Sequence, residues 1–176
     1  MSEVKTNKVS PSTGTAFTLG DSGDTFTLPS GATLTVSGTS TIASLGASTA
    51  SGTLSMADNI VSRPVVKDYG ETVNAIGAIG GGTQDIDLES GNVVTGTVDT
   101  STTTFTFSNP PTTGTAGSFT LILTNGGSQT VNWPGAVDWA GGTAPTLTTS
   151  GVDVITFTTI DGGTIWYGFA AGLDMG

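Results

Sequence analysis

Short runs in which threonine alternates with an apolar residue recur along this chain of 176 residues. Examples are Phe17-Thr18-Leu19, Thr104-Phe105-Thr106-Phe107 and Phe119-Thr120-Leu121. Successive side chains of a strand point to opposite faces, so a period of two is typical of strands that bury one face. Thr, about one residue in five, suits a pleated sheet, and 27 glycines supply turns. With no amphipathic helical period to compete, the pattern predicts an all-β protein.

Charge is distributed unevenly along the chain. Lys67 is the only basic residue among residues 66–176 and stands against ten acidic residues, so this part carries -9 of the total net charge of -10. Binding to phosphates requires Lys or Arg to neutralise them. The composition therefore makes nucleic acids and anionic membrane surfaces poor partners, whereas a basic protein surface or a neutral glycan is electrostatically acceptable. Membrane insertion is not expected.

The sequence contains no His and no Cys. It therefore has no Ser-His-Asp triad, no Cys-His pair and none of the usual zinc ligands. We expect a protein that is not an enzyme and has no cofactor. The opening Met1-Ser2-Glu3-Val4-Lys5 lacks the apolar core of a signal peptide, and no apolar run reaches the roughly 20 residues of a membrane-spanning helix. We expect a soluble product that is made in the cytosol of the producing cell.

The composition divides the chain into three predicted parts. Residues 1–15 are polar and are interpreted as a docking arm, with a disordered tail as the alternative. Residues 16–62 are predicted to form a repetitive β stem or linker, and residues 65–176 a compact β head. Arg63-Pro64 marks the boundary, because a residue that precedes proline is disfavoured in helical conformation.

Three triplets in the predicted stem follow one another at spacings of nine and eight residues: Phe17-Thr18-Leu19, Phe26-Thr27-Leu28 and Leu34-Thr35-Val36. Each is followed by Gly or Pro, as in Pro29-Ser30-Gly31. Strands this short need neighbours to bury their apolar face. We therefore expect three copies of the chain to pack around a three-fold axis; the alternative is a β-meander at the edge of the head. The predicted stem-packing residues are Phe17, Leu19, Phe26, Leu28, Leu34 and Val36.

The predicted head contains seven or eight short strands separated by turn signals, a pattern typical of an antiparallel β-sandwich, including the jelly-roll form. Two hairpins are predicted. Asn125-Gly126-Gly127 would join the run 119–123 to the run 129–133, and Asp161-Gly162-Gly163 would join 152–160 to 164–170.

Asp85, Asp87 and Glu89 are spaced so that, on a strand, they would project from one face at intervals of about 7 Å. Oxygen clusters bind Ca²⁺, so the three are candidate metal ligands. Paired carboxylates can also hydrolyse a glycoside, which makes Asp85 and Asp87 candidate catalytic residues. The favoured interpretation is a solvent-facing strand with Ile86 and Leu88 directed inward.

Trp133, Asp138 and Trp139 are the candidate ligand-contact residues, because the two indoles flank a short loop. Aromatic faces form rigid apolar platforms with a polar edge, which suits contact with a sugar. The alternative, weighted more heavily, is that the rings pack in the core or between copies of the chain.

The segment 8–29, which includes Phe17-Thr18-Leu19, resembles the N-terminal and shaft segments of tail-fibre-like proteins from marine tailed bacteriophages. The segments 117–134, 139–145 and 164–169 are similar to the terminal β domain of phage fibre and virion surface proteins. This family is defined by structural repeats, so the resemblance carries over no active-site residue. The chain is much shorter than a long fibre, which favours a short head fibre, a turret or a capsid decoration protein.

The resemblance implies a homotrimeric protein of the virion surface, made in the host cytoplasm. The arm would bind a capsid or tail protein, and the acidic head would contact the host surface or a glycan. Two alternatives belong to other classes. One is a capsid cement protein that stabilises the shell, and the other is a short tailspike-like glycan hydrolase.

Overall fold

The structure is a computed structural model that describes residues 13, 25, 27–33 and 60–176. The chain divides into two units, Met1–Val61 and Ser62–Gly176, and only the second is described throughout. The docking arm apart from Thr13, and five of the predicted stem-packing residues, lie outside the described residues: Phe17, Leu19, Phe26, Leu34 and Val36.

Leu28 is the one predicted stem-packing residue that is described; it is 42% exposed and not part of a strand. Pro29-Ser30-Gly31, which follows the second triplet, forms a turn. The amide of Ala32 donates to the carbonyl of Pro29 at 3.0 Å, and Gly31 has a φ of +83°, which favours glycine at the third position of such a turn.

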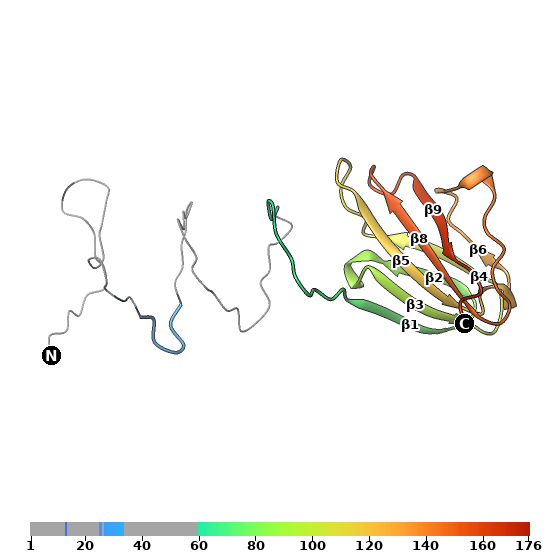
Figure 1. Cartoon of the computed structure of the whole chain (residues 1–176), viewed down its shortest axis with the longest axis horizontal. Coiled ribbons are helices and arrows are strands. Elements are labelled where there is room, and N and C mark those ends of the chain that lie inside the picture. The colour runs from blue at the N-terminus through green and yellow to red at the C-terminus, as the bar shows by residue number, and fades with distance from the viewer. Residues whose placement is uncertain (1–12, 14–24, 26, 34–59) are drawn as a thin grey trace. The chain divides into compact units, whose positions relative to one another are not determined.

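The unit 62–176 contains nine strands and three short 3-10 helices (Figure 1). The strands are β1 (Val73–Ile79), β2 (Gly82–Asp87), β3 (Val93–Val98), β4 (Thr103–Ser108), β5 (Gly117–Thr124), β6 (Val131–Asn132), β7 (Val137–Trp139), β8 (Val152–Thr159) and β9 (Trp166–Gly172). The 3-10 helices are η1 (Leu88–Ser90), η2 (Gly126–Ser128) and η3 (Ala140–Gly142). The predicted all-β class is therefore confirmed for this unit.

The first six strands alternate between two sheets. β1, β3 and β5 are parallel neighbours in a six-stranded sheet of order β1-β3-β5-β8-β9-β7, and β2, β4 and β6 are parallel neighbours in a three-stranded sheet. The chain thus crosses to the other sheet at each step and returns one strand further along. Val73 lies beside Val93, and Val93 lies beside Thr120, so successive turns of the chain are stacked as coils. Stacked short repeats of this kind bury a continuous core that none could bury alone.

The last strands close the stack differently. β8 pairs antiparallel with both β5 and β9, and the short β7 pairs parallel with β9 at the edge of the sheet. The predicted hairpin through Asp161-Gly162-Gly163 is confirmed. The predicted hairpin at Asn125-Gly126-Gly127 is wrong, because β5 and β6 belong to different sheets. The predicted antiparallel, jelly-roll-like pairing is wrong for the pairs formed among β1 to β6, which are all parallel. Inward and outward side chains alternate in β3 of one sheet and β4 of the other, and alternation does not encode strand direction.

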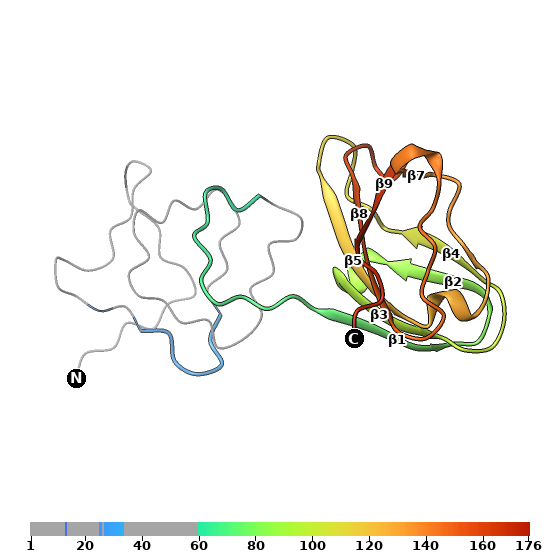
Figure 2. The same ribbon diagram turned by 45° about the vertical axis from the view of Figure 1, so that its right-hand side comes forward.

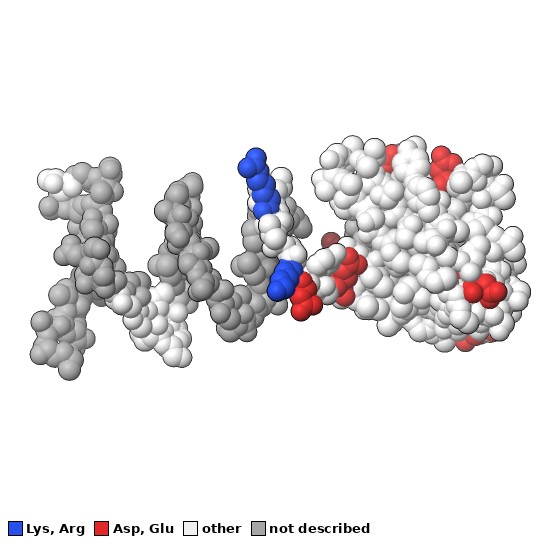
Figure 3. Space-filling model, viewed as in Figure 1, with Lys and Arg blue, Asp and Glu red and all other residues white. Residues whose placement is uncertain are grey.

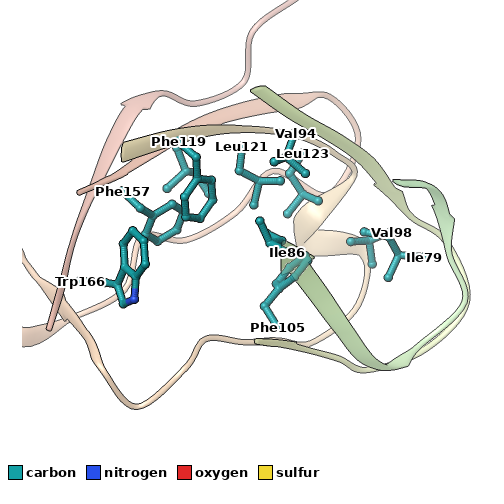
Figure 4. Close-up of a cluster of buried hydrophobic side chains, with 11 residues drawn as sticks. Ile79, Ile86, Val94, Val98, Phe105, Phe119, Leu121, Leu123, Phe157 and Trp166 are labelled. Atoms are coloured by element: carbon teal, nitrogen blue, oxygen red, sulfur yellow. The ribbon is translucent and has the colours of Figure 1, made fainter. Parts of the chain in front are cut away.

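The hydrophobic core lies between the two sheets, whose layers are visible from the side in Figure 2. Ile86 and Phe105 come from the three-stranded sheet and lie opposite Leu121 and Leu123 of the six-stranded sheet (Figure 4). Each is fully buried, which stabilises the fold by about 1.5–3 kcal/mol for a side chain of this size. The other buried apolar residues are Ile79, Val94, Val98, Phe119, Ile155, Phe157 and Trp166.

Aromatic rings fill the end of the core next to β9. Phe119 and Phe157 stack with centroids 4.9 Å apart, and Phe107 reaches both rings edge-on from the opposite sheet at 4.9 and 5.0 Å. Trp166 completes the cluster at 5.6 Å from Phe119 (Figure 4). Edge-on and offset arrangements are the favoured geometries of aromatic pairs, so the rings at this end of the core are held in well-defined orientations.

One carboxylate is buried in this unit. Asp153 follows the inward alternation of β8 and is inaccessible to solvent. Its oxygens accept hydrogen bonds from the amide of Thr148 at 2.7 Å, from the Thr148 hydroxyl at 2.6 Å and from the amide of Asp174 at 3.2 Å. A buried charge is tolerated only when it is hydrogen-bonded, and here the bonds attach two segments to β8: the loop before it and the C-terminal residues.

Among the residues that the structure describes, no helix has the length and apolar character required to span a bilayer.

Candidate functional site

The loop between β6 and β7 carries the predicted ligand-contact residues. It turns tightly, because the amide of Val137 donates to the carbonyl of Pro134 at 3.0 Å. β7 then pairs with β9, which brings Asp138 beside Tyr167 and Trp139 beside Gly168. The loop is thus attached to the edge of the six-stranded sheet.

The two indoles of this loop pack mainly inward. Trp133 stacks on Phe105 with centroids 5.4 Å apart and an interplanar angle of 18°, and it meets Trp139 edge-on at 5.4 Å. Phe157 contacts both indoles, at 5.5 and 5.6 Å. Both are half-buried, so only part of each indole is accessible to a ligand. Packing, the favoured alternative for these rings, accounts for the contacts observed.

Trp139 lies directly over a glycine of the neighbouring strand. A Cβ placed on Gly168 would stand 2.7 Å from Cζ3 of Trp139 and 2.8 Å from Cε3, closer than real Cβ contacts come. The absence of a side chain at residue 168 is therefore what allows the indole to cover the strand. This glycine positions Trp139, and no local sequence pattern links two residues so far apart.

An open pocket of about 270 Å³ lies on the outer side of the same loop. It is lined by Gly135, Ala136, Val137, Asp138, Thr164 and Ile165. Its volume is slightly below the usual range of small-molecule sites, about 300–1,000 Å³. Asp138 is exposed and lines it, whereas Trp133 and Trp139 do not. The structure therefore separates the predicted trio into one accessible carboxylate and two packed rings.

The acidic candidates lie on the outer face of the three-stranded sheet. Asp85 of β2 accepts hydrogen bonds from the hydroxyls of Thr106 at 2.6 Å and Ser108 at 2.5 Å on β4. Asp87 accepts from the side-chain amide of Asn109 at 2.9 Å and from the backbone amide of Glu89 at 3.0 Å. These bonds attach β2 to β4 across the surface. The expected inward direction of Ile86 is confirmed, since that side chain is fully buried.

Glu89 lies outside the strand, in η1, where its amide is capped by Asp87. Within residues 60–176 and the few described before them, no three acidic side chains are gathered so that they could hold a metal ion. The three predicted ligands are therefore not brought together as one such group in this structure.

Hydrogen bonding lowers the pKa of Asp87 below its ordinary value. The amide of Asn109 is the main cause, followed by the backbone amide of Glu89. A general acid in glycoside hydrolysis requires a raised pKa, so that it is protonated near neutral pH. The shift of Asp87 runs in the opposite direction, which disfavours Asp87 as that acid.

Sequence reasoning missed a surface on the outer face of the six-stranded sheet. Ile160, Ile165, Tyr167 and Phe169 are exposed and alternate with inward residues of the β8–β9 hairpin; we call these four the hairpin patch. The available signal was the apolar residue at each alternate position, where a solvated face would carry polar ones. Trp166 takes a buried position of β9, so this strand carries large apolar side chains on both of its faces.

The chain matches no family model, no curated protein and no solved structure.

Proposed function

We propose that this chain is a non-enzymatic structural protein of a virion surface: a short fibre, turret or decoration protein of a tailed phage that acts as a homotrimer. The observation that carries the proposal is the stack of coils formed by β1 to β6. Coils of short parallel strands build a rigid body by repetition, with each coil supported by its neighbours. The resemblance of residues 8–29 to fibre segments supports the same conclusion.

The head has surfaces suited to display. Asp85 and Asp87 hold a hydrogen-bonded acidic face on the three-stranded sheet, which repels nucleic acid and other acidic particles. The open pocket beside Asp138 is the place for a weak contact with a sugar of the host surface, since a carboxylate accepts hydrogen bonds from hydroxyls. Many copies on one particle would strengthen such a contact. Residues 1–15 would attach the protein to the capsid or tail.

Immunogold labelling of purified virions with an antibody raised against residues 65–176 tests this proposal. Gold at the tail tip identifies a fibre that contacts the host, and gold spread over the capsid identifies a head fibre or decoration protein. Virions that carry no gold, while the antibody detects the purified chain, would contradict the proposal. Sedimentation equilibrium of the full chain adds the oligomeric state, for which we expect three copies.

A further inference from the structure

Asp138 supplies the charged group of the open pocket beside the loop between β6 and β7. It is exposed and lines the pocket together with Thr164 and Ile165. Within residues 60–176, the carboxylates of Asp153 and Asp161 accept hydrogen bonds from backbone amides, whereas the carboxylate of Asp138 accepts none. Its charge is therefore available to a ligand.

An aromatic ring lies next to this carboxylate on the outer face of the sheet. Asp138 of β7 is the register partner of Tyr167 of β9, and neighbouring strands are about 4.8 Å apart. Tyr167 and Ile165 belong to the hairpin patch and are each 40% exposed. They alternate with the buried Trp166, so both project outward. The free carboxylate thus has an aromatic ring and an aliphatic side chain beside it.

The charge of the surroundings favours a cationic ligand. No Lys, Arg or His occurs among residues 68–176, which contain ten acidic residues. The carboxylate of Asp161 adds negative charge near the pocket, because it accepts a hydrogen bond from the amide of Ile165 at 3.0 Å. In the view of Figure 3, acidic atoms appear at separate places on the head, and basic atoms appear only on the segment that precedes β1. Such a field attracts cations and repels uronic acids and sulfated sugars.

The volume of the pocket limits the ligand to one small group. About 270 Å³ is less than the roughly 300–1,000 Å³ of sites that enclose a drug-sized molecule. Because the pocket is open, the rest of a longer chain can continue into solvent. A single sugar ring of a polysaccharide has the appropriate size.

We propose that this pocket binds a cationic amino sugar, a hexose ring with a free, unacetylated amino group. Its ammonium group donates charge-assisted hydrogen bonds to Asp138, and these are stronger than bonds between neutral groups. The apolar face of the ring lies against Tyr167, since aromatic faces form apolar platforms and attract cations. The hydroxyl of Thr164 donates to the carbonyl of Asp161 at 3.0 Å, so its oxygen can accept a bond from a sugar hydroxyl.

This inference rests on the proposed contact with a glycan and names the class of sugar. A neutral sugar offers only hydroxyls to Asp138, whereas an amino sugar also neutralises its charge. A lysine side chain brings the cation without a flat apolar face for Tyr167. The amino sugar is the ligand that matches both groups.

A matched pair of ligands tests the inference. Two tetramers of β-1,4-linked glucosamine, one with free amines and one fully N-acetylated, have the same rings and differ in charge. Both are titrated into the full chain by calorimetry at mildly acidic pH, which keeps the amines protonated. We expect the tetramer with free amines to bind about ten-fold more tightly, because charge-assisted hydrogen bonds are the stronger ones. Equal affinities, or no binding of either tetramer, would overturn the inference.

Variants of the chain locate the contact. Asp138→Asn removes the charge, keeps the shape of the side chain and should weaken binding of the free-amine tetramer about five-fold or more, with the acetylated tetramer within about two-fold. Tyr167→Ala should weaken binding of both tetramers. Asp99→Asn is the matched control, because it removes an exposed acid bonded only to Thr100. Equal losses in Asp138→Asn and Asp99→Asn would indicate a diffuse effect of charge and overturn the inference. Far-ultraviolet circular dichroism checks that all three variants are folded.

Tetralysine separates a sugar site from a site for basic protein. It carries the same number of side-chain ammonium groups as the free-amine tetramer and has no ring. If it bound more tightly and lost as much affinity in Asp138→Asn, the pocket would be assigned to a basic protein segment and the inference overturned. None of these results changes where the antibody labels a virion, so failure of the sugar site is distinguishable from failure of the proposed function.

Discussion

The outer faces of the two sheets differ in whether their side chains are hydrogen-bonded to one another. On the three-stranded sheet, carboxylates, hydroxyls and amides bond to one another across strands, as Asp85 does with Thr106 and Ser108. On the six-stranded sheet, threonines of β5 and β8 and apolar residues of β9 face outward, and Asp138 on the edge strand β7 is the exposed acid among its strands. The polar side chains of the first face therefore have partners within the chain, whereas the second face leaves Tyr167 and Phe169 exposed. The same alternating pattern thus produces one hydrogen-bonded polar face and one face with exposed apolar side chains.

The largest effect is expected where the six-stranded sheet buries a charge. Asp153→Ala leaves the amide and the hydroxyl of Thr148 without their acceptor and removes one of the two acceptors of the Asp174 amide, so it should lower the free energy of unfolding by about 3 kcal/mol. Urea denaturation followed by tryptophan fluorescence measures it. Asp99→Ala, which removes an exposed acid bonded only to the neighbouring Thr100, is the control and should change stability by less than about 1 kcal/mol. Equal effects would contradict a clamping role for Asp153.

The second largest effect on stability is expected at Gly168 of β9, over which Trp139 packs. Gly168→Ala forces the indole away and should destabilise the head by about 1–3 kcal/mol, the usual cost of overpacking. The tryptophan emission should shift as the ring moves. Gly135→Ala is the matched control, because a Cβ there meets no atom within 4 Å. A neutral Gly168→Ala would show that Trp139 is free to move.

A matched pair of threonines compares the two outer faces directly. Thr106→Val removes a hydrogen bond to Asp85 and should cost about 0.5–1 kcal/mol. Thr156→Val lies beside Phe169 and should leave stability within about 0.5 kcal/mol. Thermal or urea unfolding measures both. If Thr156→Val were the more damaging of the two, the contrast between the faces would be wrong.

The smallest effect is a dependence on pH. Hydrogen bonds from Asn109 and the amide of Glu89 lower the pKa of Asp87, and the amide of Ile165 lowers the pKa of Asp161. A carboxyl whose pKa is lower in the folded state stabilises the fold above its unfolded value of about 3.9, and this contribution is lost as pH falls through the folded pKa.

Stability should therefore decline below about pH 4, and the double variant Asp87→Asn, Asp161→Asn should show a shallower decline. The urea midpoint between pH 6 and pH 2 measures it, with Asp99→Asn as the control. A slope identical to that of the wild type would remove these two groups as its cause.

The sequence predicted strands and some turns well, because those depend on neighbours in the chain. The hairpin through Asp161-Gly162-Gly163 follows from local residues and is present. The partners of strands could not be predicted. Asn125-Gly126-Gly127 has the residues of a hairpin turn. However, Asn125 is in the left-handed region and the amide of Gly127 donates to the carbonyl of Thr148, which directs the chain into η2 and the other sheet.

The candidate site was predicted in part, for a similar reason. Trp133 and Trp139 were correctly placed at the two ends of one loop, but their packing depends on Phe105, Phe157 and Gly168, which come from other strands. No local pattern encodes such contacts.

The stacked coils also set the way in which this head can change in length. Val73 aligns with Val93, so residues 73–92 make one complete circuit through both sheets and return to the start of the next. A duplication of that segment would insert one more strand in each sheet while preserving the cross-section of the core. The body would lengthen by about 4.8 Å, the spacing between strands. The length of the head could therefore change in fixed increments, while the β8–β9 hairpin at the end of the stack stays unaltered.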